Sequence, residues 1–165
     1  MKNSRRGRNR LCGLCSVVLA MFIAETIVVR AESNESAKRV AEITDELRQE
    51  LGIPQAVDVQ IVASNSLAFS VEAVDRHTHF TISVDASFFR QLNDRELTAA
   101  LAHELGHVWI YTHHPFLHTE GLANEIALRV ISEGSLRSLY GKLQQFENSR
   151  SDHARLPDVL NSAAR

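Results

Sequence analysis

Residues 103–107 read His-Glu-Leu-Gly-His, a pattern that can both hold a metal ion and activate water. On a helix the two histidines are four positions apart, so both imidazoles project from one face and can bind one zinc ion. Glu104 directly follows the first histidine, which places its carboxylate near the metal without requiring it as a ligand. Such a carboxylate can act as a general base on water. The pattern therefore predicts metal-assisted hydrolysis.

The flanking residues predict a buried helix from Asp94 to about Tyr111. Asn93 or Asp94 can cap its start, and acidic residues follow in the first turn. The helix is apolar almost all round, which is typical of a buried helix. Buried histidine and glutamate side chains need partners, and a bound metal supplies them. The apolar residues are Leu97, Ala100, Leu101, Ala102, Leu105, Val108, Trp109 and Ile110.

Catalytic zinc normally has three protein ligands, so a third ligand is expected downstream. His113 stands where the metzincin pattern HExxHxxGxxH has its third histidine. That pattern needs glycine at the position of Ile110, because a β-branched residue does not readily adopt the required turn. It also needs a downstream methionine, and the only two are Met1 and Met21. These departures argue against a metzincin site.

The other nearby histidines are expected in a loop that connects two helices. In a continued helix His114 would lie about 10 Å along the axis from His107, too far to share one zinc. Pro115 interrupts any such helix. We therefore expect His113, His114 and His118 in this loop, from which one of them can still reach a substrate oxyanion.

A second helix is predicted over about residues 118–133, and it offers two glutamates. Glu120 and Asn124 share its apolar face, whereas Glu125 lies on the opposite, solvent-exposed side. Glu120 is therefore the expected third ligand. The side-chain oxygen of Asn124 can accept the remaining ring proton of His103 and so fix its tautomer.

The combined pattern resembles that of the gluzincin zinc metallopeptidases. Leu101-Ala-His-Glu-Leu-Gly-His107, preceded by Asp94-Arg-Glu-Leu97, is similar to the M48-type peptidases, which include the CAAX-prenyl protease type. Glu120-Gly-Leu-Ala-Asn124 is similar to the "ExEAN" motif of the ImmA/IrrE-type peptidases. The resemblance covers roughly residues 78–133. It implies a zinc-dependent endopeptidase that acts on polypeptides with Glu104 as base.

The rest of the chain predicts an α+β fold, a small zincin-like domain over residues 32–147. An amphipathic helix over 36–51 ends at Gly52. Three segments of alternating apolar residues then predict a three-stranded sheet. The zinc-binding helix and the glutamate helix follow, and a fourth helix is expected from Ser135 to about Phe146. Residues 148–165 are polar and are expected to form a flexible tail.

The third strand, His79–Asp85, has two interpretations. Gluzincins present an edge strand to the substrate peptide, and this segment precedes the zinc helix, so it can bind substrate by strand addition. The alternative is a strand of a plain structural hairpin.

Residues 1–31 resemble a signal peptide or an uncleaved N-terminal membrane anchor. Five basic residues between Lys2 and Arg10 precede an apolar stretch from Leu11 to Val29. Cys12 and Cys15 form a CxxC inside this stretch and are interpreted as small apolar residues. The remainder is expected to be exported, either secreted or periplasmic, or held outside the cytoplasm by the anchor.

The net charge of the part of the chain after residue 31 argues against one class of partner. Residues 1–31 hold 6 of the 18 Lys and Arg and 1 of the 20 Asp and Glu, so the remainder carries a net charge of −7. An acidic surface argues against nucleic acid as a partner. Contact with a membrane is expected only through the possible anchor.

Two functions remain open. In the first, a zinc peptidase uses a further electrophile to stabilise the oxyanion, and Tyr111, His113, His114 and Tyr140 are the candidates. In the second, the zinc is structural in a non-catalytic extracytoplasmic binding module, with His118 as a fourth ligand. The presence of Glu104 favours the enzyme, because a structural site has no use for a carboxylate beside the metal.

Overall fold

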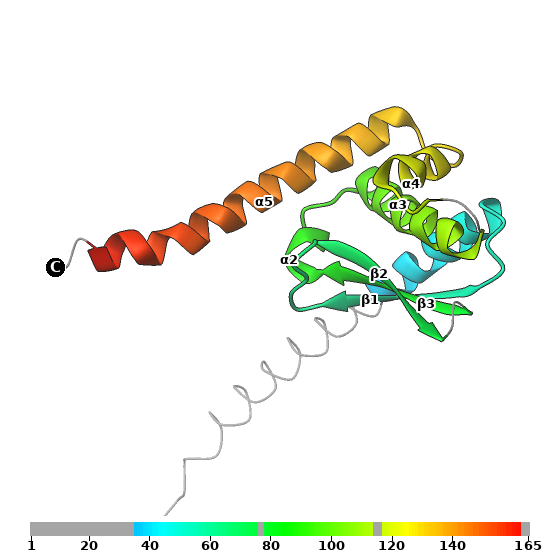
Figure 1. Cartoon of the computed structure of the whole chain (residues 1–165), viewed down its shortest axis with the longest axis horizontal. Coiled ribbons are helices and arrows are strands. Elements are labelled where there is room, and N and C mark those ends of the chain that lie inside the picture. Colours follow the sequence, from blue (N-terminus) through cyan, green and yellow to red (C-terminus); the bar gives the residue numbers. More distant parts are fainter. Residues whose placement is uncertain (1–34, 76–77, 114–116, 163–165) are drawn as a thin grey trace, which may run out of the picture. The chain divides into compact units, whose positions relative to one another are not determined.

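A computed structural model of the chain describes residues 35–75, 78–113 and 117–162 (Figure 1). The chain divides into two compact units, Met1–Lys38 and Arg39–Arg165, and the second holds the sheet and all the helices that follow it. The predicted signal peptide or anchor over 1–31, with Cys12 and Cys15, lies outside the described residues. Within those residues, no helix combines the length and apolar character needed to cross a membrane.

The element order is that of the predicted α+β fold. A helix over residues 35–50 ends at Gly52, which has a φ of 67°, and three strands follow. After the sheet come a short helix and three longer ones. Their bounds are β1 Ala56–Val62, β2 Phe69–Asp75, β3 His79–Asp85, α2 Ala86–Phe89, α3 Asp94–Thr112, α4 Glu120–Ala127 and α5 Glu133–Ser162.

The strand order β1-β3-β2 places β3 in the centre of the sheet. β1 pairs with it in parallel and β2 pairs with it antiparallel, so both of its hydrogen-bonding edges are occupied. Phe80, Ile82 and Val84 of β3 are completely buried, as expected for a central strand. The prediction that His79–Asp85 binds substrate by strand addition is therefore wrong, and β3 instead forms a structural hairpin with β2.

Helix α3 begins as predicted and packs against the sheet. The Asn93 side chain accepts a hydrogen bond from the backbone of Glu96, and the Glu96 side chain accepts one from the backbone of Asn93, which forms a capping box. Glu96 is buried and also accepts a hydrogen bond from Ser138 of α5 at 2.7 Å. The start of α3 is therefore tied to α5.

Helices α3 and α4 approach each other closely at Gly106. A Cβ atom at this position would overlap the carbonyl oxygen of Ala123 and lie 3.0 Å from its carbonyl carbon. Ala123 is completely buried. Only glycine therefore permits this backbone contact, which holds the N-terminal end of α4 beside the two histidines of α3.

Helix α4 is shorter than predicted. It starts at Glu120 with Thr119 as its cap and ends at Ala127, whereas the sequence suggested a helix over about 118–133. The next helix starts at Glu133 and not after a cap at Ser135. The Ser132 hydroxyl accepts a hydrogen bond from the backbone of Ser135, so Ser132 supplies the capping interaction.

Helix α5 continues to Ser162, so the predicted end of this helix at about Phe146 is wrong, whereas the flexibility expected for residues 148–165 stays a prediction. Arg150 donates a hydrogen bond to the carbonyl oxygen of Asn65 at 2.8 Å and lies 3.8 Å from the Asp85 carboxylate. Its guanidinium also lies over the Phe146 ring, 5.4 Å from the ring centroid. These contacts hold α5 against the domain at Arg150, and polar composition alone does not reveal them.

We predict that Gly106→Ala destabilises the protein by about 1–3 kcal/mol, because the added methyl group must push α4 away from α3. Urea denaturation measures the change in the free energy of unfolding. Gly121→Ala is the matched control, since a Cβ at Gly121 meets nothing within 4 Å. That variant should be neutral or slightly stabilising, because alanine favours helix more than glycine. Wild-type stability of Gly106→Ala would contradict the importance of this contact.

Candidate metal centre and active-site cleft

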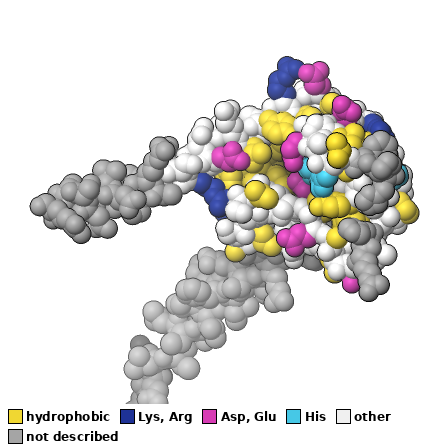
Figure 2. Space-filling model, viewed as in Figure 1, with side chains coloured by type: hydrophobic (Ala, Val, Ile, Leu, Met, Phe, Trp, Pro, Cys, Tyr) yellow, Lys and Arg dark blue, Asp and Glu magenta, His cyan; other side chains and the backbone are white. Residues whose placement is uncertain are grey.

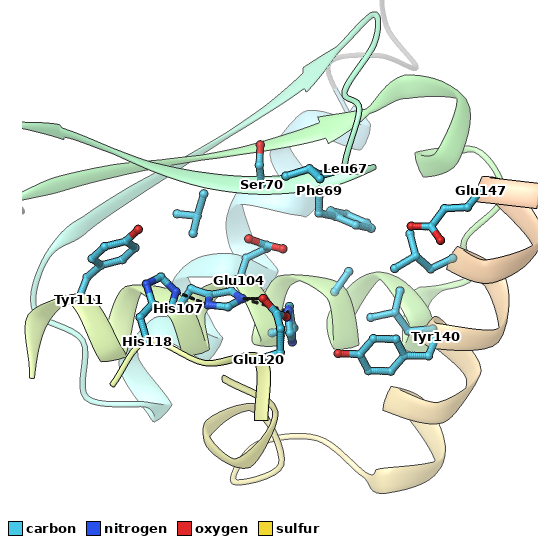
Figure 3. Close-up of a pocket in the computed structure, with 15 residues that line it drawn as sticks. Leu67, Phe69, Ser70, Glu104, His107, Tyr111, His118, Glu120, Tyr140 and Glu147 are labelled. Atoms are coloured by element: carbon cyan, nitrogen blue, oxygen red, sulfur yellow. Dashed lines mark hydrogen bonds and ion pairs between the residues drawn. The ribbon is translucent and has the colours of Figure 1, made fainter. Parts of the chain in front are cut away.

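His103, His107 and Glu120 meet where α3 and the first turn of α4 converge (Figure 3). The two histidine Nε2 atoms are 3.1 Å apart. The Glu120 carboxylate lies 3.2 Å from Nε2 of His103 and 3.5 Å from Nε2 of His107. These three side chains are the three predicted zinc ligands. The two Nε2 atoms and the Glu120 carboxylate group form a small triangle, in which Oε2 of the carboxylate faces His103 and Oε1 faces His107.

The dimensions of this triangle fit a zinc ion. Zinc bonds of about 2.0–2.1 Å in tetrahedral geometry place neighbouring ligand atoms about 3.4 Å apart. The observed separations of 3.1, 3.2 and 3.5 Å are close to this value. Two imidazoles and one carboxylate also form the donor set of a catalytic site, in which the fourth position is left for water or substrate.

Glu120 differs from the prediction in its exposure. The sequence suggested that it faces the core, but its side chain is 76% exposed, whereas the His103 side chain is 13% exposed. The reason is that Glu120 is the first residue of α4 and lies at the mouth of a cleft. Glu125 faces solvent, as predicted, on the other side of α4.

Asn124 lies where the sequence placed it, one turn beyond Glu120. Nδ1 of His103 donates a hydrogen bond to Oδ1 of Asn124 at 2.8 Å. The same oxygen accepts a hydrogen bond from the Tyr140 hydroxyl at 3.0 Å. A proton on Nδ1 leaves the Nε2 lone pair of His103 directed toward His107 and Glu120, the arrangement that a metal ligand requires.

His118 has a place that the sequence did not predict. Its Nε2 is hydrogen-bonded to Nδ1 of His107 at 2.6 Å, on the side of that ring opposite the donor triangle. Its ring also packs edge-on against Tyr111, with centroids 4.4 Å apart. This contact orients the His107 ring and differs from the fourth-ligand position expected for a structural zinc site. A hydrogen bond from a loop residue has no sequence periodicity that could have revealed it.

Glu104 is buried beside this triangle, with 6% of its surface exposed. Burial raises the pKa of its carboxyl to about 8, and the negative charge of Glu120 adds to the effect. Burial, together with the neighbouring His103, lowers the pKa of His107 to about 4. A carboxyl group with a pKa near neutrality can both take up and release a proton at neutral pH.

A cleft of about 380 Å³ opens above these residues. The first residues of β2 and Leu67 before them form one wall, and α5 forms the other. Figure 2 shows histidine and acidic side chains gathered beside hydrophobic ones on this face. The lining residues are Leu67, Phe69, Ser70, Val71, Ala100, His103, Glu104, His107, Tyr111, His118, Glu120, Leu139, Tyr140, Leu143 and Glu147.

The four candidate oxyanion residues differ in their position relative to the cleft. Tyr111 and Tyr140 line the cleft. His113 instead stacks on Trp109, with ring centroids 4.0 Å apart, and its Nδ1 donates a hydrogen bond to the Trp109 carbonyl at 2.8 Å. His113 is thus held against Trp109, and it is not among the candidates that the structure brings together at the cleft. His114 lies outside the described residues.

Comparison with known proteins gives three results. No curated protein sequence matches the chain significantly. The crystal structure of the metallopeptidase zymogen of Pyrococcus abyssi abylysin matches over 64% of this chain and 92% of that chain, with 17% identity and a TM-score of 0.48. The sequence profile of Peptidase family M48 matches residues 34–147, well over half of the chain and all of the residues that form the cleft. The chain belongs to Peptidase family M48 and is a metallopeptidase.

Proposed function

We propose that the protein is a zinc-dependent endopeptidase with His103, His107 and Glu120 as zinc ligands and Glu104 as general base. The observation that supports this most strongly is the donor triangle, whose sides match the ligand spacing of tetrahedral zinc. The buried carboxyl of Glu104 beside it supplies the proton-transfer group that a structural site would not need.

Each group at the site has a separate role in the proposed reaction. A bound zinc ion would lower the pKa of water and polarise the carbonyl of the scissile peptide bond. Glu104 takes the proton from the attacking water and delivers it to the leaving amine. Tyr111 and Tyr140 carry hydroxyl donors at the cleft, and either can stabilise the negative charge that develops on the carbonyl oxygen.

The substrate is proposed to bind along β2. In the described part of the chain β2 is an edge strand, and Phe69, Ser70 and Val71 line the cleft. An extended polypeptide can add to such an edge through backbone hydrogen bonds, so that its sequence matters little for this part of the contact. This role replaces the one that the sequence suggested for β3.

We also propose that the domain works outside the cytoplasm. The support is the basic and then apolar character of residues 1–31. The net acidic charge of the remainder separately argues against nucleic acid as a partner. The partner is then an exported or surface polypeptide and not a nucleic acid.

Glu104→Gln tests the general base. We expect cleavage of unfolded casein to fall by about 10²–10⁴-fold, because glutamine cannot take up the proton. Zinc content and the unfolding midpoint should stay near the wild-type values, since glutamine has nearly the same shape. Wild-type cleavage by this variant would refute the mechanism.

Glu120→Ala and Glu125→Ala form a matched pair for the third ligand. Removing Glu120 takes away one of three donors, so bound zinc should be lost on dialysis against a weak chelator. Glu125 lies on the solvent side of the same short helix, and its removal should leave zinc content unchanged. Zinc content is measured by atomic emission, and the reverse result would overturn the ligand assignment.

His118→Ala tests the orientation of the His107 ring. We expect zinc affinity to fall by about 10–100-fold, the usual effect of losing a partner of a zinc-bound histidine. The absorption spectrum of the cobalt-substituted protein should also shift, which a purely structural effect would not cause. His118→Gln keeps a hydrogen-bonding group and should recover part of the affinity.

His113→Ala is the control, because His113 belongs to the same connecting segment but stacks on Trp109 away from the cleft. It should leave zinc affinity unchanged. Equal affinities for His118→Ala and the wild type would mean that the 2.6 Å contact does not support the metal centre.

A further inference from the structure

The cleft continues beyond the metal centre along α5. Leu139, Leu143 and Glu147 line it and are spaced four residues apart, so they lie on one face of the helix over two successive turns. Leu67 and Phe69 line the opposite wall. In Figure 3 the Glu147 carboxylate points from α5 into this end of the cleft, and Glu104 and Glu120 lie at the other end. The end of the cleft that lies away from the candidate metal centre is thus an apolar channel, and the Glu147 carboxylate lies where this channel ends.

Glu147 is not used by the rest of the protein. Among the described residues, no hydrogen bond or ion pair engages its carboxylate. Arg150, three residues later on α5, is directed instead toward the Asn65 carbonyl and the Asp85 carboxylate. The side chain therefore adds a negative charge to the cleft without serving the fold.

The distance from the metal centre to Glu147 favours a long substrate side chain. Tyr140 is linked through Asn124 to His103, and Glu147 follows Tyr140 by seven residues. Seven residues of helix correspond to a rise of roughly 10 Å. A short side chain next to the scissile bond would not reach this carboxylate.

We propose that this end of the cleft selects a lysine or arginine side chain of the substrate, with Glu147 binding its charged end. The inference rests on the proposed peptidase function. Lysine and arginine have long apolar stems that pack against apolar walls while the charged end reaches a polar group. Leu139, Leu143 and Phe69 provide such walls, and Glu147 provides the opposite charge.

The charges around the cleft disfavour the other classes of side chain. The lining includes three glutamates, Glu104, Glu120 and Glu147, and no lysine or arginine. An acidic substrate side chain would be repelled by Glu147. A long apolar side chain would fit the walls but would cover the carboxylate without giving it a partner, at a cost in solvation.

The experiment maps the bonds that the full-length, zinc-loaded protein cuts in a mixture of unfolded proteins, with mass spectrometry as the readout. We expect lysine and arginine to be enriched at one fixed position relative to the cut, by about two- to fivefold, the range for a partly exposed ion pair. Glu147→Gln should abolish this enrichment, and Glu147→Lys should shift it toward aspartate and glutamate. The enrichment should also weaken at high salt.

Glu133→Gln is the matched control on the same helix, since Glu133 pairs with Arg137 outside the cleft. It should leave the cleavage profile unchanged. An identical profile for the wild type and Glu147→Lys, with cleavage retained, overturns the role of Glu147 but leaves the peptidase function intact. Absence of cleavage by the wild type in every substrate overturns both proposals.

Discussion

The site depends on the backbone contact between Gly106 and Ala123. The two histidines of α3 come from one helix and need only helical periodicity to share a face. Glu120 comes from a separate helix, and it reaches their Nε2 atoms only because α4 packs closely enough to exclude any side chain at position 106. The glycine in the His-Glu-Leu-Gly-His sequence therefore has a steric role that is as specific as the chemical roles of its neighbours.

The side-chain positions that the sequence anticipated at the candidate site follow from short-range patterns. His103 and His107 share a face at a spacing of four, and so do Glu120 and Asn124. The hydrogen bond between His103 and Asn124 follows once the two helices are placed side by side. The capping box at Asn93 and Glu96 is likewise a short-range signal.

The parts that the sequence did not predict depend on long-range pairing. The alternation of apolar and polar residues in His79–Asp85 indicates a strand but does not indicate where the strand lies in the sheet. Its central position results from the parallel pairing with β1. Helix α5 extends past Phe146, and there Arg150 contacts Asn65, 85 positions earlier in the chain. His118 orients His107 from a connecting segment, where no periodicity applies. In each case the deciding partner is distant in sequence or lacks a repeating pattern.

Helix α5 makes polar contacts with the domain through Ser138 to Glu96, through Tyr140 to Asn124, and through Arg150 to Asn65 and Asp85. The cleft wall formed by Leu139, Leu143 and Glu147 lies between the first and the last of these contacts along the helix. The middle contact joins this wall to the candidate metal centre, because the Asn124 oxygen that accepts a hydrogen bond from Tyr140 also accepts one from His103. A sequence change at Tyr140 therefore acts on both the channel and the orientation of His103, whereas changes at Ser138 or Arg150 reach the channel wall without touching that shared oxygen.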